Sequence, residues 1–208
     1  MKLRNWATKT HQTRESINEM LSIFRDEGYK LPKDARTLLR TPRSISTVSL
    51  CCGSYSYFGI ERAIRQCLTK NEWFVLENSS VALIVNIDGV PLFKSTSEQL
   101  WPILISFGKF RPLIVALYMG KSKPSPVNDF LKDFLFEYSR LKESGITVNG
   151  KVLSVHVMCY SCDVPARAFL KCIKGHAGYF SCERCTVQGK SENRRMVMPT
   201  IDSPKRTD

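Results

Sequence analysis

The chain has 208 residues, of which 43% are hydrophobic and 10% aromatic, so we expect a packed interior rather than a disordered chain. Its 31 Lys and Arg residues against 19 Asp and Glu residues give a formal net charge of +12, which favours polyanionic partners such as nucleic acid. No stretch approaches the roughly 20 apolar residues that a membrane span needs, and residues 1–10 lack the apolar region of a secretory signal.

The basic residues are concentrated toward the two ends of the chain. Residues 1–48 hold ten Lys and Arg against five Asp and Glu, and residues 165–208 hold nine against four. The middle, residues 49–164, is nearly balanced, with twelve against ten. This distribution predicts a buried core with DNA-facing ends. An anionic membrane is disfavoured, because no segment combines a basic face with a strongly apolar one.

Residues 11–28 are predicted to form a helix, because the apolar residues between Ile17 and Phe24 recur with helical spacing. Thr13 is suited to the N-cap of this helix. The segment that follows, residues 31–41, is a turn and a short basic piece. It is interpreted either as a simple DNA-reading element or as an arm that packs on the next domain.

The middle of the chain predicts a mixed α/β sheet. The apolar run 81–87 has the character of a central strand that is covered on both faces. The aromatic segment 53–59 is interpreted as turn-rich local core, and 60–67 as a helix. Further along, the pattern predicts strands at 99–107 and 112–119, a helix capped by Ser125 with Pro126 at its first position and ending at Gly145, a strand at 152–160, and a helix at 164–173. Three meandering strands, a helical crossover and a further strand form such a sheet.

Two aspartates share one sequence context. Asp88 and Asp163 each follow a long apolar strand and open a turn. If the two strands are parallel neighbours, both carboxylates fall at the same end of the sheet, where α/β proteins bind ligands. Two carboxylates about 5 Å apart repel by roughly 3 kcal/mol at an effective dielectric constant near 20. A bound Mg²⁺ or Mn²⁺ reverses that repulsion and can support phosphodiester chemistry. The alternative is an ordinary turn at Asp88 and an ordinary helix cap at Asp163.

Clustered cysteines predict a structural zinc site. Cys172, His176, Cys182 and Cys185 have the short spacings that bring sulfur and imidazole ligands to one tetrahedral ion. Zinc in such a knuckle contributes roughly 10–16 kcal/mol to local folding, which suits a segment with few core-forming residues.

A second pairing of cysteines competes with this one. Cys159 and Cys162 also form a CxxC pattern, and with the pair Cys182 and Cys185 they give four cysteines. This alternative ranks lower, because Cys159 lies in a predicted strand, where positions three apart point to opposite faces. The remaining cysteines, at positions 51, 52 and 67, are interpreted as buried free thiols.

Several segments, taken in order, resemble the CACTA (EnSpm)-type DDE transposases and their relatives in animal genomes. The resemblance covers most of residues 11–190. It rests on the segments Leu31–Pro42, Asp88–Ser95, Gln99–Leu104, Pro112–Gly120, Cys162–Ala168 and the final Gly-His-x-Gly-Tyr-x-x-Cys-x-x-Cys that ends at Cys185.

The resemblance implies a ribonuclease-H-like fold, with Asp88 and Asp163 as the first two catalytic metal ligands on the first and fourth core strands. It also implies nuclear action on transposon-end DNA, in which water nicks a strand and a 3′-hydroxyl then attacks target DNA. The family's third acidic ligand lies on a later helix. No strand and helix to carry it follow the knuckle in this sequence, and Glu183 is a poor substitute between two expected zinc ligands.

We therefore predict an incomplete ribonuclease-H-like α/β core with a helical lead-in and a zinc knuckle. The expected divisions are a basic lead-in and DNA-binding arm at 1–48, a partial core at 49–171, the knuckle at 172–185 and a flexible tail at 186–208. The alternatives are a non-catalytic, domesticated DNA-binding protein and a zinc-stabilised protein-interaction module. The sequence leaves the oligomeric state open, a homo-oligomer included.

Overall fold

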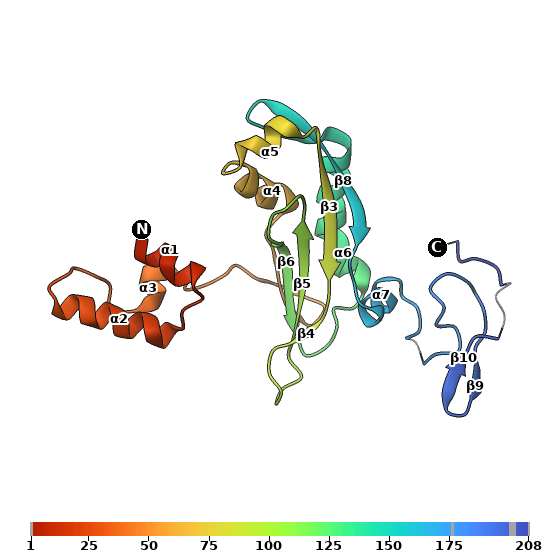
Figure 1. The fold of residues 1–208 in the computed structure, drawn as a ribbon. Coiled ribbons are helices and arrows are strands. Elements are labelled where there is room, and N and C mark those ends of the chain that lie inside the picture. The colour runs from red at the N-terminus through yellow and green to blue at the C-terminus, as the bar shows by residue number, and fades with distance from the viewer. Residues whose placement is uncertain (1, 176, 200–202, 208) are drawn as a thin grey trace. The chain divides into compact units, whose positions relative to one another are not determined.

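The computed structural model describes residues 2–175, 177–199 and 203–207. The chain divides into two compact units, residues 1–46 and residues 47–208. Over residues 2–46 the regular structure of the first unit is helical, whereas the second unit contains a mixed sheet with helices (Figure 1).

The first unit contains three helices around a small core. They are α1 (Lys2–Lys9), α2 (Arg14–Asp26) and α3 (Ala35–Leu39). The core consists of Ala7, Ile17, Leu21 and Ala35. The predicted helix at 11–28 is confirmed as α2, and Thr13 caps it by accepting a hydrogen bond of 3.1 Å from the backbone N–H of Ser16. Helix α1 was not predicted.

The second unit contains an eight-stranded sheet. Its strands are β1 (Val48–Leu50), β2 (Gly53–Tyr57), β3 (Ser80–Ile87), β4 (Val90–Pro91), β5 (Gln99–Ser106), β6 (Leu113–Gly120), β7 (Ile146–Val148) and β8 (Lys151–Tyr160). The strand order is β1-β2-β6-β5-β3-β8-β7, and β4 pairs with β5 outside this path. Strands β3 and β8 are parallel, while all other neighbours are antiparallel. The predicted mixed α/β class is confirmed.

Four helices and a hairpin complete this unit. They are α4 (Ile60–Leu68), α5 (Glu72–Glu77), α6 (Val127–Ser144), α7 (Val164–Leu170), and the hairpin of β9 (Lys190–Glu192) and β10 (Arg195–Val197). Helix α6 carries the chain from β6 to β7 and runs behind β3 and β8 in Figure 1. It ends at Gly145, as predicted, where φ is +68° and a Cβ would lie 2.7 Å from the carbonyl oxygen of Leu153.

The pairing of β3 with β8 contains one irregularity. Leu83 pairs with Val157, but the next residue, Ile84, pairs with Cys159. Met158 is therefore an extra residue in β8, which is the pattern of a β-bulge. The bulge lies a few residues before the carboxyl ends of both strands.

One face of the sheet forms the core with α4 and α6. Strand β3 alternates strictly, because Val81, Leu83, Val85 and Ile87 are buried while the residues between them are partly exposed. Phe130 and Phe134 of α6 belong to the same core cluster, as do several apolar residues of α4. The expectation that β3 is covered on both faces is wrong, because both helices contribute to a core on one face only.

Three local predictions differ from the structure. The segment 53–59 was interpreted as local turns, but β2 pairs with β6 and extends the sheet. Helix α6 has Pro126 rather than Ser125 at its N-cap. Strand β7 was not predicted and forms the outer hairpin strand beside β8.

A carboxylate from α6 caps the start of α4. Gly59 precedes α4 and has no side chain to cap it. Glu137 takes that role, because its carboxylate accepts hydrogen bonds from the backbone N–H groups of Ile60, at 2.6 Å, and Glu61, at 3.1 Å. The same carboxylate accepts a short bond from the Tyr57 hydroxyl, so it joins β2, α4 and α6.

We predict that Glu137→Gln destabilises the second unit. The glutamine amide has one acceptor oxygen where the carboxylate has two, and its NH₂ group would face some of the donors that now bond to Glu137. The loss should be about 1–3 kcal/mol in the free energy of unfolding, measured by urea titration. Glu143→Gln, on an exposed position of the same helix, is the control. Equal stability of the two variants would contradict this role for Glu137.

Candidate metal and nucleic-acid site

Asp88 and Asp163 lie at the carboxyl ends of neighbouring parallel strands. Asp88 directly follows β3, and Asp163 follows β8 after two residues. The two strands remain joined at this end, because the backbone N–H of Ser161 donates to the carbonyl oxygen of Val85 at 2.8 Å. The Asn86 side chain adds a hydrogen bond to the Ser161 carbonyl oxygen. The geometry on which the sequence hypothesis depends, two parallel neighbours, is therefore present.

Each carboxylate uses one oxygen to organise its own turn. Asp88 Oδ1 accepts from the backbone N–H of Gly89 at 2.7 Å. Asp163 Oδ1 accepts from the backbone N–H of Ala166 at 2.7 Å and so caps α7. The turn at Asp88 and the cap at Asp163 are therefore confirmed. Both use Oδ1, so they are compatible with a metal ion bound at Oδ2 of each aspartate. Asp88 is partly buried and Asp163 is exposed.

The thiol of Cys162 lies under the influence of both carboxylates. Burial raises the pKa of this thiol, and the negative charges of Asp88 and Asp163 raise it further. Both carboxylates therefore lie within electrostatic reach of the same thiol. Cys162 therefore lies at this edge of the sheet. The sequence suggested a role for it only as a ligand in the alternative four-cysteine zinc site.

A pair of aromatic rings in contact supports the turn at Asp88. The ring of Trp101, on β5, lies where a Cβ at Gly89 would come within 2.5 Å of it. The Phe169 ring, on α7, has its centroid 4.9 Å from that of Trp101. The Lys123 ammonium lies 5.5 Å and 5.6 Å from the two centroids, within the range of cation–π attraction. The contact between Trp101 and Phe169 thus connects the Asp88 turn to the helix that Asp163 caps.

A hollow of about 300 Å³ lies beside this edge. Ile87 and Cys162, at the ends of the two strands, line it together with residues of α6. Arg167 of α7 and Lys171, which directly follows this helix, add two cationic side chains, while Asp88 and Asp163 are not among the lining residues. The site edge, which we define as Asp88, Cys162, Asp163 and the adjoining α7, therefore combines carboxylates with cations that suit phosphate groups.

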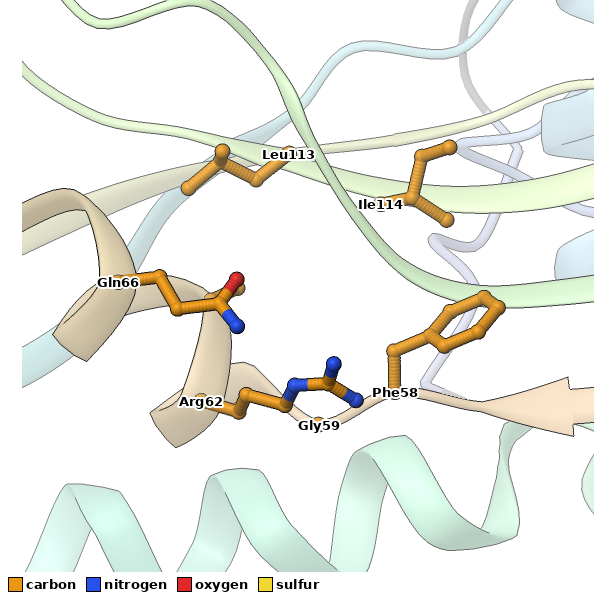
Figure 2. A pocket seen from close by; sticks show the side chains of 7 residues that line it. Phe58, Gly59, Arg62, Gln66, Leu113 and Ile114 are labelled. Atoms are coloured by element: carbon orange, nitrogen blue, oxygen red, sulfur yellow. The ribbon is translucent and has the colours of Figure 1, made fainter. Parts of the chain in front are cut away.

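A second hollow lies between α4 and the start of β6. Figure 2 shows Arg62 and Gln66 projecting from α4 into the space before Leu113 and Ile114. Its volume is about 280 Å³. Strand β6 begins at Leu113, which is level with Val85 of β3 across β5, and the residues that line this hollow include none of the site edge. It is therefore separate from the site edge.

The predicted zinc ligands are brought together only in part. The sulfur atoms of Cys182 and Cys185 lie 3.3 Å apart. A hydrogen bond from the backbone N–H of Arg184 lowers the pKa of the Cys182 thiol, and the Cys185 thiol lowers it further. Cys172 is exposed and does not join the pair in a three-ligand group. His176 lies outside the described residues.

Ion pairs of Glu183 and a hydrogen bond from Arg206 connect the CxxC segment to its surroundings. Glu183 lies 3.3 Å from Arg167 Nε, in an ion pair without hydrogen-bond geometry, and 3.8 Å from Lys171 Nζ. Arg206 donates from Nε to the Cys182 carbonyl oxygen at 2.9 Å. The segment predicted to be a flexible tail therefore includes a hairpin and a return to the cysteine pair. Glu183 is engaged with cations of α7.

Within residues 2–175, 177–199 and 203–207, no three His, Cys, Asp or Glu side chains gather closely enough to hold a metal ion. Over the same residues, no helix has both the length and the apolarity needed to cross a bilayer. Comparison with protein-family models and with curated proteins gave no match. The function is therefore argued from the site edge itself.

We predict that Gly89→Ala disturbs this edge. The added methyl group would overlap the Trp101 ring, which is 3% exposed and cannot move away freely. Overpacking of this kind costs about 1–3 kcal/mol, which should lower the midpoint of thermal unfolding. Gly175→Ala is the matched control, because a Cβ at that position meets nothing within 4 Å. A midpoint unchanged from wild type would contradict the close contact.

Proposed function

We propose that this chain is the DNA-binding and metal-binding part of a DDE-type transposase that acts in the nucleus and is built on a ribonuclease-H-like core. One observation carries the proposal: Asp88 and Asp163 follow parallel neighbouring strands. Among the four long strands β3, β5, β6 and β8, taken in chain order, they follow the first and the fourth. These are the positions that the resemblance to CACTA-type transposases implies for the first two metal ligands.

The donor set fits a hard divalent cation. Each aspartate retains one carboxylate oxygen, and Mg²⁺ commonly binds through one or two carboxylates together with substrate phosphates and water. The ion would offset the repulsion between the two carboxylates and stabilise charge on a reacting phosphodiester. Within the described residues, Asp88 and Asp163 would hold the ion, while Arg167 and Lys171 would orient the phosphate. DNA strand cleavage and transfer would require a third acidic ligand in addition to these two aspartates.

The charge distribution supports DNA as the partner. Basic residues are concentrated at both ends of the chain, and the formal net charge is +12. Cations also lie on the elements that adjoin the two carboxylates, because Lys123 lies over the Trp101 ring next to Gly89 and Arg167 lies in the helix that Asp163 caps. Neutralisation of phosphates by such residues releases counterions, so we expect binding that weakens as salt rises.

We predict that Fe²⁺, used in place of Mg²⁺, cleaves the polypeptide near residues 88 and 163 when ascorbate and peroxide generate hydroxyl radicals at the bound ion. Both cuts should be mapped by mass spectrometry and suppressed by excess Mg²⁺. Asp88→Asn and Asp163→Asn should each remove both cuts, because one ion requires both ligands. Salt-sensitive binding of a DNA duplex should persist in both variants.

Asp129→Asn, an exposed aspartate on α6, is the control for this experiment and should leave the cuts unchanged. Cuts that persist in Asp88→Asn would exclude a shared metal site. Absence of DNA binding by the wild-type chain at low salt would instead favour a zinc-stabilised protein-interaction module.

We further propose that Cys182 and Cys185 hold a structural zinc ion together with Cys172 and His176. The 3.3 Å approach of the two sulfur atoms supports the CxxC half of this set. Cys172 would then have to move toward the pair when zinc binds. Such a change fits small zinc domains, in which metal binding and local folding occur together.

We predict about one zinc ion per chain by elemental analysis of purified protein, and its loss in Cys182→Ser and in Cys185→Ser. Cys67→Ser, a partly buried cysteine of α4, should retain the full content. Loss of zinc in Cys159→Ser but not in Cys172→Ser would instead support the alternative four-cysteine set.

A further inference from the structure

The first unit contains a hollow of about 620 Å³ rich in arginine. We call it the arginine hollow. Its lining consists of Asp34, Arg36, Thr37, Arg40, Thr41, Pro42 and Arg43. All of these residues except Asp34 and Pro42 carry guanidinium or hydroxyl groups that can donate hydrogen bonds, and the three arginines are exposed.

The end of α3 fixes the shape of the hollow. The backbone N–H of Thr41 donates to the carbonyl oxygen of Arg36 at 2.8 Å, and that of Arg40 donates to Thr37 at 3.3 Å. These two bonds form a Schellman motif, which reverses the chain so that residues before and after the turn line one hollow. They also occupy two carbonyl oxygens at the helix end, which would otherwise repel an anion.

Arg40 occupies a position where glycine is favoured. Its φ is +56° and its ψ +42°, the left-handed conformation that closes a Schellman motif. This conformation is strained for a residue with a Cβ, and glycine adopts it without that strain. Arginine is therefore not the residue that best stabilises this helix end, which points to a role for its side chain.

The charge balance of the hollow leaves two arginines available. Asp34 is the one acidic residue of the lining, and it pairs with Arg14 at 3.0 Å and Arg36 at 3.4 Å. The backbone N–H of Arg36, followed by the Arg14 guanidinium, lowers the pKa of Asp34, which stays ionised and paired. Over the residues that the structure describes, Arg40 and Arg43 form no ion pair with an acidic group.

We propose that the arginine hollow binds the sugar-phosphate backbone of duplex DNA. Guanidinium groups match phosphate oxygens with paired hydrogen bonds, and threonine hydroxyls add neutral donors. Contacts of this kind position a protein on DNA without reading its sequence. The inference rests on the DNA-binding half of the proposed function and assigns that binding to named residues, separate from the carboxylates of the site edge.

The test measures binding of the full chain to a duplex of arbitrary sequence over a series of salt concentrations. In Arg40→Gly, the slope of log affinity against log salt should fall by about 0.9, because one phosphate contact is lost. The unfolding midpoint should stay equal to that of wild type or rise, because glycine relieves the strain. Arg43→Gln should show the same loss of slope without any backbone change.

Arg111→Gln is the matched control for Arg43→Gln. Arg111 is also exposed, but it lies in the middle segment 49–164, where basic and acidic residues are nearly balanced. This variant loses the same charge, but it should keep the wild-type slope. Equal losses of slope in Arg43→Gln and Arg111→Gln would overturn the proposal, as would a wild-type slope near zero.

The radical-cleavage experiment separates this inference from the metal site. Cuts near residues 88 and 163 should be unaffected by Arg40→Gly. If the cuts are absent from wild type while the slope falls in Arg40→Gly, the metal proposal fails and the arginine hollow stands. If the cuts are present and the slope does not fall, the arginine hollow fails alone.

Discussion

The parallel pairing of β3 with β8 is the constraint on which the rest of the second unit depends. Two parallel strands cannot be joined by a tight turn, so the chain must cross the sheet between them. Helix α6 performs that crossing and supplies Phe130 and Phe134 to the core. Its Glu137 then caps α4, so the same crossover also fixes the start of a second helix. Without this pairing, neither the core nor the common edge of Asp88 and Asp163 would exist.

Long apolar patterns made the central elements predictable. Strands β3, β5, β6 and β8 and helix α6 each contain enough periodic apolar residues to reveal their type, and each lies close to its predicted bounds. One element that was missed, β2, depends on a partner far away in the chain. Strand β2, with the sequence Gly-Ser-Tyr-Ser-Tyr, looks like a turn until β6 pairs with it. The coverage of β3 was also misjudged, because an apolar run does not reveal on which side the helices lie.

The candidate site shows the same division between local and distant information. Asp88 and Asp163 could be found from the sequence, since each follows a recognisable strand. The cluster of Trp101, Phe169 and Lys123 could not be found in this way, because its members come from three separate segments. For the cysteines, spacing alone placed Cys182 next to Cys185, but it gave no information on the distance from either to Cys172.

The extra residue Met158 determines how β8 arrives at the site. Side chains along a strand alternate between two faces, so one additional residue exchanges the faces for everything that follows it. Cys159 rather than Met158 stands opposite Ile84, and the chain reaches Asp163 with its alternation shifted by one step. The number of residues in β8 therefore determines on which face each side chain lies, as well as how far the strand extends. Removal of a single residue there would leave the strand just as apolar and yet turn Cys159 and Tyr160 to the opposite faces of the sheet.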